Sequence, residues 1–126
     1  MIDNQQQNII RIAVPTNDHI SIFPAMLGLA AFFDIYEMNA DHDFILVEKR
    51  KNPSQKTMQH QKTLDVYEVI KDCSIIVAGK IGKNGIPRLE AKGMQLLLHK
   101  GKIDRVLNHI LPLNFTANII GCGPAD

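Results

Sequence analysis

The chain has 126 residues, of which 45% are hydrophobic, and this is the size and composition of one globular domain with a substantial core. Its formal net charge of +1 lacks the basic excess of a dedicated nucleic-acid binder, so we expect no nucleic-acid partner. The longest apolar run, Ile22–Phe33, is too short to span a bilayer and contains Pro24 and Gly28, so we expect no membrane partner.

The two cysteines and the start of the chain indicate the compartment. Cys73 and Cys122 follow a polar opening without a basic, apolar or small-residue leader, which argues against secretion and predicts a cytoplasmic protein. We expect residues 1–8 to be a flexible lead-in, residues 9–110 to form a single domain and residues 111–126 to be an irregular tail.

The first half of the chain predicts a strand, a short helix and a hairpin. Turn-forming residues at 15–19 end the first strand, and Pro24 suits the first turn of the helix. Acidic residues alternate with apolar ones in the hairpin, so we interpret Asp34, Glu37 and Glu48 as its solvated face. The expected elements are a strand at Ile9–Val14, a buried helix at Phe23–Ala31, and hairpin strands at Phe32–Met38 and Phe44–Arg50.

The second half alternates helices and strands. A helix capped by Thr63 ends at residues 72–73, and a brief helix at Pro87–Lys92 separates two apolar runs, Ile75–Ala78 and Met94–Leu98, that are typical of central strands. A last helix spans Lys102–His109. A hairpin followed by a β-α-β unit predicts a three-layer α/β fold with a mixed, roughly five-stranded sheet.

The sequence GKIGKNG, residues 79–85, is the strongest candidate for a binding site, and we call it the glycine loop. It leaves a predicted parallel strand and enters a helix, where backbone N–H groups favour an anion, and Lys80 and Lys83 add positive charge. A Walker loop needs Ser or Thr after Lys83, and the Rossmann spacing also fails, so a nucleotide is disfavoured. The competing interpretation is a tight turn that only satisfies backbone geometry.

Other chemistry-bearing residues give weaker signals. His60, in a polar segment, is either a mobile metal ligand or a solvated histidine, and Cys122, between two glycines, is the more accessible thiol. Cys73 precedes a buried strand and fits the core. Three basic residues at helical spacing form either a basic face or an ordinary solvated stripe: Lys102, Arg105 and His109.

The sequence shows no recognisable combination of catalytic residues. We assign no role to His19, His42 or His99, and no Ser-His-Asp, Cys-His or paired acidic set stands at a defensible spacing, which favours a protein that is not an enzyme. A two-metal nuclease needs clustered carboxylates, and the strand-borne acidic residues do not suggest such a cluster.

Several landmarks occur together in an order that a known family shares. They are MLGLAAFFDIY at Met26–Tyr36, Asn52-Pro53, Asp72-Cys73-Ser74 and AGKIGKNGIPRLEAKGMQLLL from Ala78. With them, residues 10–107 resemble the dinitrogenase iron-molybdenum cofactor biosynthesis family, which comprises the NifX-like domains and the related C-terminal domain of NifB.

The resemblance implies a ribonuclease H-like α/β fold and a non-catalytic protein that carries an iron-sulfur or iron-molybdenum-type cluster between donor and acceptor proteins. Such clusters are anionic, so backbone N–H groups and basic side chains suit them. His60 or Cys122 would then be a labile metal ligand. The expected cradle consists of Gly79, Lys80, Gly82, Lys83, Asn84, Gly85 and Arg88.

The chain departs from the family motif where the family places histidine and arginine, because Met26 and Leu29 stand there. Met26 is either a thioether ligand or, as we favour, apolar filler of a core or an interface. The departure keeps an alternative function open, in which the fold is retained, cluster binding is lost, and the apolar Phe23–Phe33 region docks on a partner or forms a homodimer.

Overall fold

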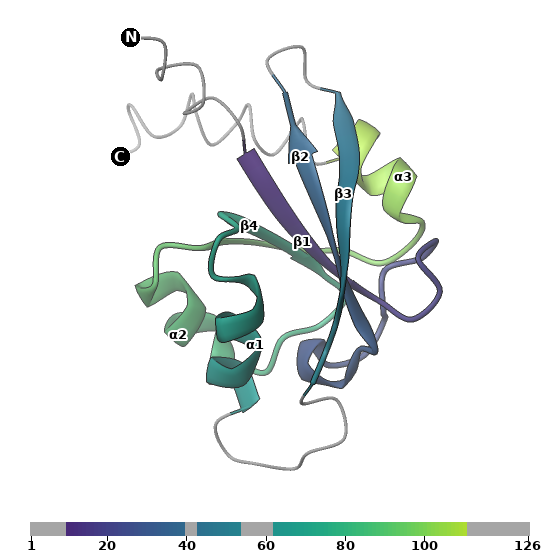
Figure 1. Ribbon diagram of the computed structural model, residues 1–126. Helices are drawn as coiled ribbons and strands as arrows, with labels where there is room; N and C mark the ends of the chain where they lie inside the picture. Colours follow the sequence, from purple (N-terminus) through teal and green to yellow (C-terminus); the bar gives the residue numbers. More distant parts are fainter. Residues whose placement is uncertain (1–9, 40–42, 54–61, 111–126) are drawn as a thin grey trace, which may run out of the picture.

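A computed structural model describes residues 10–39, 43–53 and 62–110, and Figure 1 shows their arrangement. The expected lead-in and tail, residues 1–8 and 111–126, lie outside these ranges, as do His42, His60 and Cys122. None of the described helices is long and apolar enough to cross a bilayer.

The sheet has five strands in the order β3-β2-β1-β4-β5. β1 is antiparallel to β2 and parallel to β4, and β5 continues the sheet in parallel, so the predicted mixed sheet is confirmed. The strands are β1 (Ile10–Thr16), β2 (Phe32–Met38), β3 (Phe44–Lys51), β4 (Ile75–Ala78) and β5 (Gln95–Leu98).

Helices cover both faces of the sheet, which confirms the predicted three-layer α/β fold. α1 (Lys62–Ile70) and α2 (Gly85–Ala91) lie on one side of the sheet in Figure 1, and α3 (Ile103–Arg105) lies on the other. α3 continues directly into η3, a π-helical turn at Val106–Ile110. Alternate residues of β1 separate the two cores, because Ala13 packs towards α1 while Ile12 and Val14 pack towards α3.

The expected helix at Phe23–Ala31 is wrong. Only a short 3-10 turn forms, η2 (Leu27–Leu29), because the backbone before it is bonded to other parts of the chain. The N–H of Phe23 donates to the carbonyl of Pro15 at 2.8 Å, and Leu27 N–H donates to the carbonyl of Lys80 at 2.9 Å. In an α-helix over these residues the N–H of Leu27 would donate to the carbonyl of Phe23, so its bond to Lys80 and the helix exclude each other.

Two further expectations need correction. β5 is an edge strand rather than a central one, and its first and last residues, Gln95 and Leu98, are exposed. Pro15 and Thr16, expected in a turn, extend β1 opposite Phe33 and Phe32. An apolar run of four residues reports hydrophobicity but not the number of neighbouring strands, so the pattern alone could not place β5.

A carboxylate clamp fastens the end of α1 to the sheet. Arg50 Nη1 and Nη2 donate to the two carboxylate oxygens of Asp72 at 2.7 and 2.8 Å, Arg50 also donates to the carbonyl of Val69, and Arg11 donates to Asp72 as well. These guanidinium groups, Arg50 above all, hold the pKa of Asp72 well below its usual range. We call Arg11, Arg50 and Asp72 the Asp72 clamp.

Cys73, next to the clamp, is buried as expected of a core residue. Its side chain belongs to the cluster beneath α1, and burial raises the pKa of its thiol to about 12. The thiolate form that a metal requires is therefore disfavoured at this cysteine.

Candidate functional site

The glycine loop lies at the sheet edge where the parallel strands end. β1 and β4 are parallel neighbours, so the chain segments that follow them emerge at the same edge. The loop contacts residues 23–29, which we call the Met26 segment: Met26 and Lys80 form a parallel backbone bridge, and Leu27 donates to Lys80. The predicted site thus joins two segments far apart in the sequence.

Gly79 permits this contact because its α-carbon lies against the Met26 segment. A β-carbon at this position would stand 2.6 Å from the carbonyl oxygen of Phe23 and 2.9 Å from the α-carbon of Pro24. Real β-carbons do not approach backbone atoms that closely, so only glycine fits without separating the two segments. Gly82 is less constrained, because its nearest neighbour is the terminal methyl group of Met26, at 3.0 Å from the equivalent position.

The loop turns into α2 as the sequence predicts. The carbonyl of Gly82 accepts hydrogen bonds from the N–H groups of Gly85 at 2.8 Å and Ile86 at 3.2 Å. Among the described residues, the preceding N–H groups of Gly82, Lys83 and Asn84 donate to no protein acceptor. Consecutive N–H groups of this kind offer donors to an anion.

Basic residues flank these donors along the chain. Lys80, Lys83 and Arg88 are exposed, and none of them forms an ion pair within the part of the chain that the structure describes. The structure therefore brings together every residue of the predicted cradle, six in the loop and Arg88 one turn into α2. Gly85 is buried, and the side chain of Asn84 makes no capping hydrogen bond.

An apolar cavity of about 120 Å³ opens between the glycine loop, the Met26 segment and α1. Met26 is 37% exposed and Leu29 is 40% exposed, so Met26 is not core filler, and its interpretation as interface filler stays a prediction. Its side chain lies at the surface beside the loop instead. The cavity is lined by Met26, Leu27, Gly28, Leu29, Val66, Ile81 and Gly82.

The predicted metal ligands, His60 and Cys122, lie outside the described residues, so their role stays a prediction. Within the described ranges, no three His, Cys, Asp or Glu residues are grouped closely enough to hold a metal ion together. The described part of the site therefore offers anion donors and positive charge rather than a closed metal cage.

The sequence analysis missed a buried carboxylate that is hydrogen-bonded to a histidine at the same edge. Nδ1 of His19 lies 2.9 Å from each carboxylate oxygen of Asp34, whose side chain is fully buried. Burial raises the pKa of Asp34, while the bond to His19 acts in the opposite direction. The expectation of a solvated Asp34 is wrong, because this residue stands opposite Val14 on the face that α3 covers.

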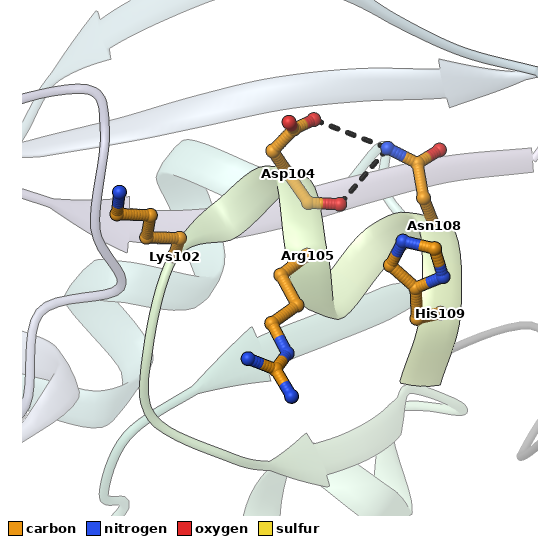
Figure 2. Close-up of a pocket in the computed structure, with 5 residues that line it drawn as sticks. All are labelled: Lys102, Asp104, Arg105, Asn108 and His109. Atoms are coloured by element: carbon orange, nitrogen blue, oxygen red, sulfur yellow. Dashed lines mark hydrogen bonds between the residues drawn. The ribbon is translucent and has the colours of Figure 1, made fainter.

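A second basic region lies on α3 and η3 (Figure 2). Lys102, Arg105 and His109 line one open cavity of about 550 Å³ together with Asp104 and Asn108. Figure 2 shows the amide of Asn108 bonded to the carboxylate of Asp104. This hydrogen bond is 3.1 Å long, and Arg105 forms no ion pair in the described ranges. The three basic residues at helical spacing thus share one face, as the sequence suggested.

Comparison with known proteins identifies the family. The family model described as dinitrogenase iron-molybdenum cofactor matches residues 8–112. A search of curated proteins finds no match.

Solved structures share the fold at low sequence identity. The crystal structure of PH0822 is 20% identical with a TM-score of 0.66, covering 82% of this chain and 91% of that chain. The apo form of the orange protein from Desulfovibrio gigas is 20% identical with a TM-score of 0.64, covering 81% and 87%. A putative NifB protein from Thermotoga is 16% identical with a TM-score of 0.57, covering 82% and 88%.

These structures support the fold alone, whereas the family model spans the sheet, the Met26 segment, the glycine loop and α3. The chain belongs to the dinitrogenase iron-molybdenum cofactor family.

Proposed function

We propose that this protein is a non-catalytic carrier of an anionic iron-sulfur cluster, either of the iron-molybdenum cofactor type or a precursor of it. The observation that carries the proposal is the glycine loop, where the N–H groups of residues 82–84, which have no acceptor in the described part of the chain, stand beside Lys80 and Lys83 in the sequence. Family membership supplies the class of ligand, and an apo form of one similar structure, the orange protein, is known.

Charge and hydrogen bonding suit this ligand. Bridging sulfides of such clusters accept hydrogen bonds, and the net negative charge favours N–H donors and ammonium groups. Lysine side chains are mobile, so they hold an anion without fixing its orientation. A cradle of this kind binds through many weak contacts, which matches a carrier that must release its cargo.

The remaining roles belong to the same proposal. His60 or Cys122 provides a labile metal bond, from a segment outside the described residues. The partners are proteins that deliver the cluster and proteins that receive it, and they meet the carrier in the cytoplasm. No nucleic acid takes part.

Anaerobic loading tests the cradle. The purified protein is incubated with ferrous iron and sulfide, passed through gel filtration, and assayed for iron and sulfide in the protein peak. We expect co-elution that falls several-fold in a Lys80→Ala/Lys83→Ala variant. Lys71→Ala/Lys92→Ala is the matched control, because it removes two exposed lysines that precede β4 and β5 at the opposite edge. Equal losses in both variants would contradict the cradle.

A second candidate function follows from the exposed apolar side chains. Met26 and Leu29 border the cavity beside the loop and could enter a protein interface, including a homodimer formed through residues 23–33. Analytical ultracentrifugation of wild type and a Leu29→Glu variant tests it. A wild-type dimer that dissociates in the variant supports this function, whereas a monomer at all accessible concentrations contradicts the homodimer.

A further inference from the structure

The tautomer of His19 is fixed by the carboxylate beneath it. Nδ1 lies 2.9 Å from both oxygens of Asp34, and the described residues offer this carboxylate no other hydrogen-bond donor. A carboxylate accepts hydrogen bonds, so Nδ1 carries the proton in the neutral imidazole. The lone pair of the ring is then on Nε2.

Nε2 of His19 faces solvent. It has no hydrogen-bond partner in the described part of the chain, and no buried side-chain nitrogen or oxygen there lacks a partner. The side chain is 27% exposed, and its ring packs against Phe32 with centroids 4.6 Å apart. The imidazole is thus held through Nδ1, whereas Nε2 is accessible to solvent.

The backbone around His19 is fixed as well. Its φ angle is +66°, a left-handed conformation that costs energy for a residue with a side chain. The N–H of His19 donates to Oγ1 of Thr16 at 3.0 Å, and this hydroxyl donates to the carbonyl of Ser21 at 2.7 Å. Ile22 N–H then ties the segment to the carbonyl of Gly101 at 2.9 Å. The imidazole is positioned before any ligand arrives.

Burying a carboxylate is unfavourable, and a solvated histidine in a turn does not require one. In metal sites, by contrast, a ligating histidine commonly donates its other N–H to a carboxylate, which fixes the ring and raises its basicity. We propose that Nε2 of His19 is a metal ligand and supplies a protein bond to one metal atom of the cargo cluster. The identity of the cargo rests on the proposed function.

A cluster fits this single donor better than a bare ion does. Within the described ranges, no third metal-ligating side chain joins His19 and Asp34, so a bare ion would be held weakly. A cluster brings its own sulfide ligands and needs few protein bonds. His19 follows β1 and the glycine loop follows β4, so both emerge at one edge of the sheet.

His99 provides a matched control. It follows β5 at the same edge, and its Nδ1 contacts the carbonyl oxygen of Lys100 at 2.9 Å rather than a buried carboxylate. If any oriented histidine at this edge sufficed, substitution of either residue would have the same effect.

The first test uses the apo protein and Co²⁺ alone. Long-range ¹⁵N–¹H spectra should place the proton of neutral His19 on Nδ1. Titration with Co²⁺ should broaden amide signals of residues 16–21 and 32–34 first, in wild type and His99→Gln but not in His19→Gln. Asp34→Asn should weaken this broadening several-fold with the chain still folded by circular dichroism. A proton on Nε2, or broadening elsewhere that spares residues 16–21, overturns the proposal without use of a variant.

The second test uses protein labelled with ¹⁵N-histidine and loaded with iron and sulfide. Pulsed electron paramagnetic resonance of the reduced sample should show a ¹⁵N coupling that in His19→Gln is lost or reduced to the contribution of His60, and that persists in full in His99→Gln. Retained iron with an unchanged coupling in His19→Gln overturns the proposal and leaves the carrier function standing. Site-specific Co²⁺ binding without any retained iron supports the ligand role of His19 and contradicts the carrier function.

Discussion

Two groups of basic residues in this chain are used in opposite ways. In the Asp72 clamp, Arg11 and Arg50 share one carboxylate and fasten α1 to the sheet. At the glycine loop, Lys80 and Lys83 are exposed and form no ion pair within the described residues. A cation that is already paired contributes to stability, whereas an unpaired cation keeps its charge for a ligand. Basic residues therefore serve the fold in one place and, under the proposed function, binding in the other.

The largest expected effect joins stability and binding at the glycine loop. Gly79→Ala places a β-carbon against backbone atoms of Phe23 and Pro24, and we expect a loss of about 3 kcal/mol in the free energy of unfolding. Iron retention should fall too, because the loop and the Met26 segment must separate. Urea unfolding and iron analysis measure both effects.

Gly82→Ala is the control for Gly79→Ala. Its new β-carbon meets only the flexible end of Met26, so we expect a loss below about 1 kcal/mol. Similar losses at both positions would show that the close backbone approach of Gly79 is not the cause.

The next largest expected effect is a loss of stability at the Asp72 clamp, without an effect on iron retention. Asp72→Asn removes the charge that Arg50 and Arg11 share, and we expect unfolding to become easier by about 2 kcal/mol with iron retention unchanged. Lys71→Ala breaks only the exposed pair with Glu68 and should leave the free energy of unfolding nearly unchanged. Reduced iron retention in Asp72→Asn at a temperature where it stays folded would contradict the division between the two groups.

Lowering the pH should change the contributions of Asp72 and Asp34 to stability in opposite directions. The pKa of Asp72 is lowered in the folded state, so its stabilising effect is present above the unfolded value of about 4 and is lost as pH falls below it. The pKa of Asp34 is raised, so between about 4 and its folded value stability increases as pH falls. The free energy of unfolding is measured for wild type, Asp72→Asn and Asp34→Asn between about pH 3 and 7. Relative to wild type, the slope of this energy against pH should decrease in Asp72→Asn and increase in Asp34→Asn.

The smallest effect on stability is expected at Arg88. Arg88→Gln removes an exposed cation without a described partner, so the free energy of unfolding should change by less than about 0.5 kcal/mol. Iron retention should weaken modestly, and the weakening should diminish at high salt, where all surface charges are screened. A destabilisation as large as that of Asp72→Asn would place Arg88 in the structural group.

Local patterns explain which parts of the fold could be predicted from the sequence. The hairpin β2-β3 and the order β4, glycine loop, α2 follow from turn residues and apolar runs that are contiguous in the chain. The Met26 segment was mispredicted because its N–H groups bond to Pro15 and Lys80, which no local pattern reveals. Propensity therefore failed where distant backbone segments compete for the same donors.

The candidate site also has one part that could be predicted from the sequence and one part that could not. The cradle residues are neighbours in the sequence and could be named from it. Asp34 and His19 are 15 positions apart, and they meet only because β1 and β2 pair in one register and the turn after β1 folds back. An aspartate inside the apolar FFDIY strand was the available signal, because a charge in a strand covered on both faces requires a partner.

The bridge between Met26 and Lys80 depends on the backbone and not on the identity of either side chain. It is made by main-chain atoms, so it does not require a methionine side chain at this position. Mutation can therefore exchange residue 26 for one of different chemistry without rebuilding the frame around it. Position 26 is thus evolvable: substitutions there can change the chemistry beside the glycine loop while the fold is inherited unchanged.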